Sequence, residues 1–142
     1  MTDFAQYDGY KQDFDFYVGP ARQDDFRSRE FGDRLWADVS RILKTPFDGG
    51  TITPDSHEGY NYWFDNDDLS SSLYSGPRES GSGVLDQMPA ILTVISRSED
   101  VASSELAERI YAGLTASDDY LVVVFAHNGM PIAAKFDIGD DW

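Results

Sequence analysis

His57 and His127 are the residues of this chain best suited to bind a metal or to transfer a proton. A zinc site needs three or four nitrogen, sulfur or oxygen ligands, and the chain contains no cysteine. A zinc site would therefore need both histidines together with carboxylates from distant segments, and this is the alternative interpretation. We expect two solvated histidines, one in a loop and one at a strand end, and no metal or cofactor.

The acidic cluster at residues 65–68 (DNDD) offers the oxygen ligands that calcium prefers. An EF-hand loop counted from Asp65 would need an oxygen ligand at its fifth position and glycine at its sixth. The chain has Leu69 and Ser70 at these positions, so the motif is absent. The cluster therefore predicts a solvated acidic turn after a strand, with a looser cation site as the alternative.

Other catalytic patterns are incomplete. The segment Gly76–Gly83 has the glycine spacing of a phosphate loop but lacks its lysine, and the chain has no Gly-x-Ser-x-Gly nucleophile motif. Asp13 and Asp15 share a strand face about 7 Å apart, so they could form a catalytic carboxylate pair. Two exposed residues on an edge strand have the same spacing, and we favour this second interpretation. We therefore expect no catalytic residues. A small enzyme with its site near residues 65–89 is an alternative.

Hydrophobic periodicity indicates the elements that would position these residues. Alternating or continuous apolar runs favour strands, and apolar residues at helical spacing favour helices. The predicted side-chain caps of the first helix are Asp24 or Asp25. For the second helix, Ser96 and Glu99 match a capping box, with Ser98 or Asp100 as the alternative cap. The pattern predicts strands at 14–18, 59–64, 90–96, 121–126 and 131–136, a candidate short strand at 51–53, and helices at 24–44 and 98–116.

The C-terminal part of the chain carries the clearest hairpin signal. Leu121 to Ala126 is continuously apolar and rich in β-branched residues, which predicts a strand covered on both faces at the centre of the sheet. Asn128-Gly129 favours a tight turn, and Pro131 to Phe136 is predicted to return antiparallel. This last strand is an edge to which a second copy could pair, so both a monomer and a homodimer remain open.

The order of predicted elements indicates an α+β fold, with two helices on one face of a mostly antiparallel sheet. The first six elements follow the ferredoxin-like order βαββαβ, and an extra C-terminal hairpin strand is added. We expect a single domain over residues 1–142. Residues 65–89 are rich in serine and glycine, so they are predicted to form a flexible loop.

The chain is strongly acidic, with 26 acidic and 11 basic residues and a net charge of −15. Such a surface repels nucleic acid and anionic membranes and attracts a basic protein partner. The chain begins without a signal-like segment and has no apolar run of membrane-spanning length, so we expect a cytoplasmic protein. Adaptation to high salt is an alternative reason for a surface rich in aspartate and poor in lysine.

One constellation predicts an interaction site. The segment GYNYWF, residues 59–64, favours a strand whose tyrosines and phenylalanine face the core while Trp63 lies on the other face, close to the acidic cluster. Tyrosine and tryptophan are common interface anchors, and nearby carboxylates attract a cationic partner. The predicted partner-binding residues are Glu58, Tyr60, Trp63, Asp65, Asp67 and Asp68.

In composition and size, a cysteine-free acidic α+β domain with DNDD beside GYNYWF resembles the immunity proteins of bacterial toxin–immunity systems. These proteins commonly neutralise nuclease or other toxin domains by covering the active site with acidic and aromatic residues. The resemblance covers the whole chain, involves no diagnostic motif and transfers no binding residue. It implies a non-catalytic protein that neutralises a basic toxin domain.

Overall fold

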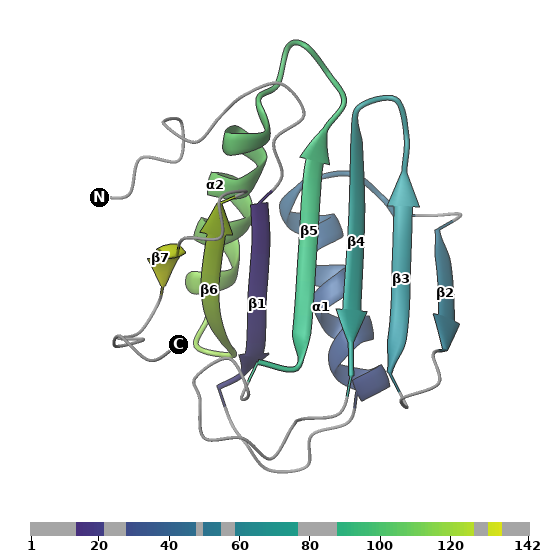
Figure 1. Cartoon of the computed structure of the whole chain (residues 1–142), viewed down its shortest axis with the longest axis vertical. Helices are drawn as coiled ribbons and strands as arrows, with labels where there is room; N and C mark the ends of the chain where they lie inside the picture. The colour runs from purple at the N-terminus through teal and green to yellow at the C-terminus, as the bar shows by residue number, and fades with distance from the viewer. Residues whose placement is uncertain are drawn as a thin grey trace.

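The described residues form a single antiparallel sheet and two helices, in the order β2-β3-β4-β5-β1-β6-β7 across the sheet (Figure 1). The elements are β1 (Phe14–Pro20), α1 (Ser28–Ile42), β2 (Thr51–Pro54), β3 (Tyr60–Asp65), β4 (Leu69–Ser75), β5 (Ala90–Ser96), α2 (Ser103–Thr115), β6 (Tyr120–Ala126) and β7 (Pro131–Ala134). The computed structural model describes residues 14–21, 28–47, 50–54, 59–76, 88–126 and 131–134.

The predicted α+β class is confirmed, with both helices on one face of the sheet (Figure 1). The strand order differs from βαββαβ plus one hairpin strand, because β2 extends the sheet beyond β3 and β4 lies between β3 and β5. Both β5 and β6 are antiparallel to β1, which lies between them, so they run parallel to each other. The connection through α2 is therefore a split βαβ unit.

The flexible loop predicted at residues 65–89 is wrong for its first part, because β4 occupies residues 69–75. Leu69 and Leu73 are buried on the helix side, and the buried Ser71 and Ser75 alternate with them along the same face. Small serine side chains leave room for α1, which packs against this strand. The alternation of leucine and serine on one face therefore indicates a strand whose core-facing residues are partly small. Residues 77–87 lie outside the described ranges.

The core lies between the sheet and the helices. Apolar stripes of α1 and α2 pack on the strand residues that face them, as the helical spacing predicts. Neither helix of the described ranges is long and apolar enough to cross a lipid bilayer. The buried helix residues of this cluster are Leu35, Trp36, Val39, Leu106, Ala107, Ile110 and Leu114.

The second helix begins later than predicted. Its N-cap is Ala102, which makes no side-chain capping bond, so the caps predicted within residues 96–100 are wrong. The hydroxyl of Ser103 instead accepts the backbone N–H of Ser96 at 2.9 Å. This hydrogen bond links Ser96, the last residue of β5, to Ser103, the first residue of α2. The predicted caps of the first helix, Asp24 and Asp25, lie outside the described residues.

Strand β6 is buried on both faces, as predicted. Val122 and Val124 face the helices, while Val123 and Phe125 pack with Met88 on the opposite side. Its predicted position at the centre of the sheet is wrong, because β6 is second from the β7 edge and β5 is the middle strand of the described sheet. The antiparallel pairing of β6 with β7 is confirmed, and the turn between them lies outside the described residues.

Candidate functional site

The face of the sheet turned away from α1 and α2, called the open face below, carries the most exposed large apolar side chain of the described residues. Trp63 is 56% exposed, whereas its neighbour Tyr62 points to the helices and is 1% exposed. The strand alternation predicted for GYNYWF is therefore confirmed. The open-face residues directly opposite or two positions along from Trp63 are Thr51, Asn61, Asp65 and Ser72.

Small and polar residues surround this indole. Thr51 of β2 and Ser72 of β4 lie directly opposite Trp63 on its two neighbouring strands. Both are exposed, so the indole stands above short side chains and is not packed into an apolar cluster. Covering its exposed part, roughly 100–140 Å², would contribute about 3 kcal/mol to binding of a partner. Trp63 is therefore available as an interface anchor.

The acidic cluster forms the turn between β3 and β4. The side-chain oxygen of Asn66 accepts the backbone N–H groups of Asp68 at 2.8 Å and Leu69 at 2.9 Å. The backbone N–H of Asn66 donates to the Leu69 carbonyl at 3.0 Å, which closes the hairpin. Asparagine suits this role because its short side chain replaces backbone partners in turns. The turn leaves Asp67 and Asp68 exposed at its tip.

Among the described residues, Arg97, which directly follows β5, is a cationic residue that contacts this turn. Its backbone N–H donates to the Asp68 carbonyl at 2.8 Å, and its guanidinium pairs with Asp65 at 3.3 Å. Both side chains of the pair are substantially exposed, so the ion pair is screened by water and weak. Asp67 and Asp68 form no ion pair with another described residue, so they keep their negative charge for an external cation.

Two further carboxylates lie at the same end of the sheet as this turn, a placement that the sequence did not reveal (Figure 1). Glu99 and Asp100 follow Arg97, whose backbone is bonded to Asp68, and both are exposed. The β3–β4 turn and the β5–α2 connection lie at the same end of the sheet (Figure 1). The sequence pattern predicts Glu99 as part of a helix cap, whereas the pairing of β4 with β5 places it at the same end of the sheet as the β3–β4 turn. We call Asp65, Asp67, Asp68, Glu99 and Asp100 the acidic end.

One of the predicted partner-binding residues, Tyr60, does not join Trp63. Tyr60 lies on the helix side of β3, half-buried, with the Arg29 guanidinium carbon 5.4 Å from its ring centroid. The strand alternation therefore separates Tyr60 from Trp63, although both belong to the same aromatic segment. Glu58 lies outside the described residues. The structure thus brings together Trp63 and Asp65 on the open face, with Asp67 and Asp68 at the adjoining turn.

Asp15 also lies on the open face, but not on an edge strand as predicted. Strand β1 is interior, between β5 and β6, and the hydroxyl of Thr93 on β5 donates to Asp15 at 2.7 Å. The side chain is half-buried and already accepts a hydrogen bond, which gives it a structural role in the sheet. The other carboxylate of the predicted pair, Asp13, lies outside the described residues.

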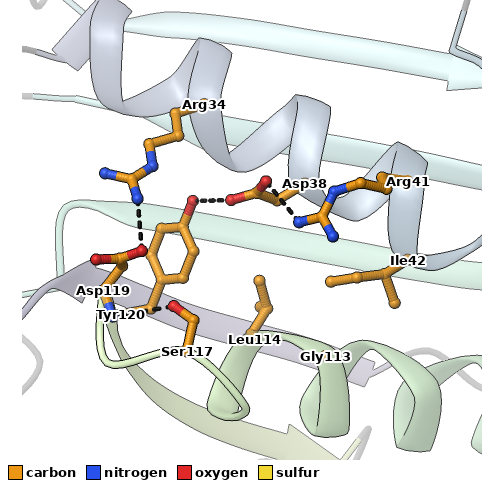
Figure 2. Close-up of a pocket in the computed structure, with 9 residues that line it drawn as sticks. All are labelled: Arg34, Asp38, Arg41, Ile42, Gly113, Leu114, Ser117, Asp119 and Tyr120. Carbon is orange, nitrogen blue, oxygen red and sulfur yellow. Dashed lines mark hydrogen bonds and ion pairs between the residues drawn. The ribbon is translucent and has the colours of Figure 1, made fainter.

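A separate pocket of about 240 Å³ lies between α1, the end of α2 and the start of β6 (Figure 2). Arg34 pairs with Asp119 at 2.6 Å, and Arg41 pairs with Asp38 at 2.8 Å. The Tyr120 hydroxyl donates to the same Asp38 carboxylate. Each arginine is thus matched by a carboxylate, so these four charges sum to zero and give the pocket no preference for an anion.

Two buried tyrosines have raised pKa values: Tyr120, which lines this pocket, and Tyr62, which precedes Trp63 on β3. Burial raises the pKa of Tyr120 above its usual value of 10, and its hydrogen bond to Asp38 raises it further. Burial raises the pKa of Tyr62 in the same way, helped by a hydroxyl–carboxylate bond of 2.7 Å to Asp33. Both phenols are therefore neutral donors at physiological pH, and they attach β6 and β3 to α1.

Within the described ranges, histidine and carboxylate side chains form no group of three or more that could hold a metal ion. Both histidines, His57 and His127, lie outside these ranges. Comparison with known proteins finds no family model, no curated protein and no solved structure that matches this chain. The features of the described residues that bear on function are therefore the exposed tryptophan and the acidic end, together with the charge of the chain.

Proposed function

We propose that this chain is a non-catalytic binding protein that captures and neutralises a basic protein partner in the cytoplasm, as an immunity protein does for a toxin domain. The observation that carries the proposal is a 56% exposed tryptophan on an open sheet face, beside an acidic turn. The partner would be a protein domain, because a net charge of −15 repels nucleic acid and anionic membranes.

Charge and aromatic contact would act at different stages of binding. Opposite net charges accelerate the diffusional encounter, and exposed carboxylates at the acidic end orient the approaching cationic surface. Once the complex forms, Trp63 is buried against the partner and slows dissociation. Asp65 lies two residues along the same strand face from Trp63, which favours a lysine or arginine that contacts both the indole and the carboxylate.

The direct test is neutralisation in cells. The probe is the C-terminal domain encoded by the gene immediately upstream, expressed with and without this chain, and the readout is growth. We expect the chain to restore growth. Trp63→Ser should weaken binding of the isolated domain in calorimetry by roughly 30-fold, because a central tryptophan anchor contributes about 2 kcal/mol.

The matched control is Trp63→Phe, which keeps an aromatic ring at the same position and should retain most of the affinity. Both variants should remain folded in circular dichroism, with Trp63→Phe close to the wild-type melting temperature and Trp63→Ser several degrees below it, because part of the indole is buried on the sheet. Absence of growth rescue by the wild-type chain together with absence of calorimetric binding would refute the proposed function.

Salt dependence separates this proposal from adaptation to brine. A salt-adapted protein needs concentrated salt to stay folded, because its carboxylates repel each other in dilute buffer. We expect this chain to stay folded at about 50 mM salt, measured by circular dichroism. Unfolding on dialysis into such a buffer would favour the salt-adaptation alternative.

A further inference from the structure

Strand β2 is an exposed edge of the sheet. In the described sheet it has one neighbour, β3, and all four of its residues are exposed. An edge strand presents backbone N–H and C=O groups to which another extended chain can bond, and in β2 the donors can come only from Thr51, Ile52 and Thr53, because Pro54 has no N–H. At the opposite edge of the described sheet, the described side chains of β7 are half-buried, whereas every β2 side chain is exposed. Among the described strands, the edge with exposed side chains is therefore β2, next to the strand that carries Trp63.

The two exposed large apolar side chains of the described residues lie on the edge strand and on the strand next to it, on opposite faces of the sheet. Ile52 of β2 is 40% exposed on the helix side, opposite Tyr62, while Trp63 of β3 is on the open face, opposite Thr51. A strand added to β2 would therefore contact Ile52 directly on one face, and on the other a long side chain could reach across Thr51 to the indole of Trp63. This arrangement is typical of peptide recognition by strand addition, in which backbone bonds give affinity and alternate side chains give specificity.

The charge of this part of the chain selects the occupant. Between Lys44 and Arg78 the sequence has six acidic residues and no lysine or arginine. This segment, residues 45–77, includes β2, β3 and β4, and Arg97 is the cation that pairs with it at the acidic end. A second copy of this chain would bring an equally acidic segment against the edge. A cationic strand would instead be attracted to it.

The geometry points to β2 as the docking edge for an extended cationic segment of the partner, which would pair with β2 as an added strand and place lysine or arginine side chains beside Trp63. This inference rests on the proposed capture of a basic protein and specifies how that protein is held. Backbone pairing would fix the orientation of the partner, while the indole and the acidic end would select its positive charge.

The test uses a synthetic peptide, acetyl-Lys-Val-Thr-Val-Lys-Val-Thr-Val-Lys-amide, and the ¹⁵N-labelled chain. Its valines fall on one face of a strand and its lysines on the other, to match Ile52 and Trp63. We expect amide chemical-shift changes confined to β2 and β3. At a peptide concentration ten times its Kd, hydrogen exchange of the β2 amides should slow by about tenfold, because only the unbound state exchanges.

Two controls separate strand pairing from attraction between charges. The same peptide with its second to eighth backbone amides N-methylated keeps its charge but cannot donate, and it should bind at least about fivefold more weakly. Ile52→Lys adds a cation to the edge and should weaken peptide binding by roughly fivefold. Ala112→Lys adds the same charge at an exposed position of α2 and should leave binding within about twofold of wild type.

Besides failure of the peptide to bind, three results would overturn the inference: shifts spread over the acidic surface, equal binding of the N-methylated peptide, or a β2-paired dimer of this chain in sedimentation without peptide. In the last case a second copy would be the occupant. Failure of the peptide to bind β2, with growth rescue intact, would refute the docking edge and leave the proposed function standing. Failure of growth rescue, with the peptide bound at β2, would refute the proposed function alone.

Discussion

Two buried tyrosines make the stability of this protein sensitive to alkaline pH. Tyr62 and Tyr120 are 1% and 2% exposed, and the hydroxyl of each donates to a carboxylate on α1. Burial is the main reason that the pKa of each phenol is raised above 10, and the neighbouring carboxylate raises it further. The folded state therefore retains both protons at a pH at which unfolded tyrosine has lost them.

The sign and size of the effect follow from proton linkage. A raised folded-state pKa contributes stability that is fully present below pH 10 and is lost as the pH rises towards the folded value. Above pH 10 each tyrosine lowers the free energy of unfolding by about 1.4 kcal/mol per pH unit. Together the two tyrosines should therefore remove about 2.8 kcal/mol per unit. Tyr111, whose pKa is also raised by burial, acts in the same direction.

The assay is urea unfolding followed by circular dichroism at about pH 9, 10 and 11. Tyr62→Phe and Tyr120→Phe should each reduce the alkaline slope by about 1.4 kcal/mol per pH unit, while costing about 1 kcal/mol at neutral pH for the lost hydrogen bond. Val39→Ala is the control, because it enlarges a core cavity without removing a titrating group. It should lower stability equally at every pH.

A flat stability profile between pH 9 and 11 would contradict this reasoning. An unchanged slope in both phenylalanine variants would do so as well. In either case, neither phenol would be held neutral by the core, and the account of how β3 and β6 are attached to α1 would be wrong.

Three further substitutions test the packing and the charge of the interaction surface. Ser71→Ala should raise the free energy of unfolding by about 1 kcal/mol and the melting temperature by several degrees, because the buried Ser71 hydroxyl has no hydrogen-bond partner among the described residues. Gly32→Ala should lower the unfolding free energy in urea by about 1–2 kcal/mol, because its Cβ would lie 2.6 Å from the Tyr62 hydroxyl oxygen; unchanged stability would show that the ring is free to move. Arg97→Gln should raise the association rate with the basic domain roughly twofold in stopped-flow mixing, because it removes the cation paired with Asp65. A slower rate would show that the guanidinium is needed to hold the turn.

Strong periodicity made most of the fold predictable from the sequence. Strand β1 alternates buried Phe14, Phe16 and Val18 with half-buried residues, and β6 is apolar on every described residue because both of its faces are covered. A periodic pattern reports which faces of an element are buried, and it carries no information about the order of strands in the sheet. For this reason β6, which is buried on both faces, was wrongly placed at the centre of the sheet.

Strand β4 was missed because its core face is half serine. Leu69 and Leu73 are four residues apart, and the buried serines between and beyond them resemble a loop in composition. Their burial depends on contact with α1, a tertiary effect that local propensity does not contain. Because β4 was not predicted, the strand that lies between β3 and β5 was missed, and so was the position of β2 as an edge strand.

The interaction surface could be predicted in part. Strand alternation correctly separated Trp63 from Tyr62, because period-two geometry is a local property. The same alternation places Tyr60 on the helix side, so grouping it with Trp63 contradicted the pattern itself. Glu99 and Asp100 were not found, because only the pairing of β4 with β5 brings the β5–α2 connection next to the turn between β3 and β4.

The most direct test of the proposed capture by charge and an aromatic anchor is the rate constant for association with a candidate basic domain, the one tested for growth rescue above. The rate constant is measured by stopped flow at about 50 mM salt. A triple variant of the turn, Asp65→Asn, Asp67→Asn and Asp68→Asn, should associate roughly three- to tenfold more slowly than wild type. The charge-matched control on the helices, Glu30→Gln, Glu105→Gln and Glu108→Gln, should slow association by less than about twofold. Equal rates for the two triple variants would contradict the assignment of the acidic turn as the contact surface.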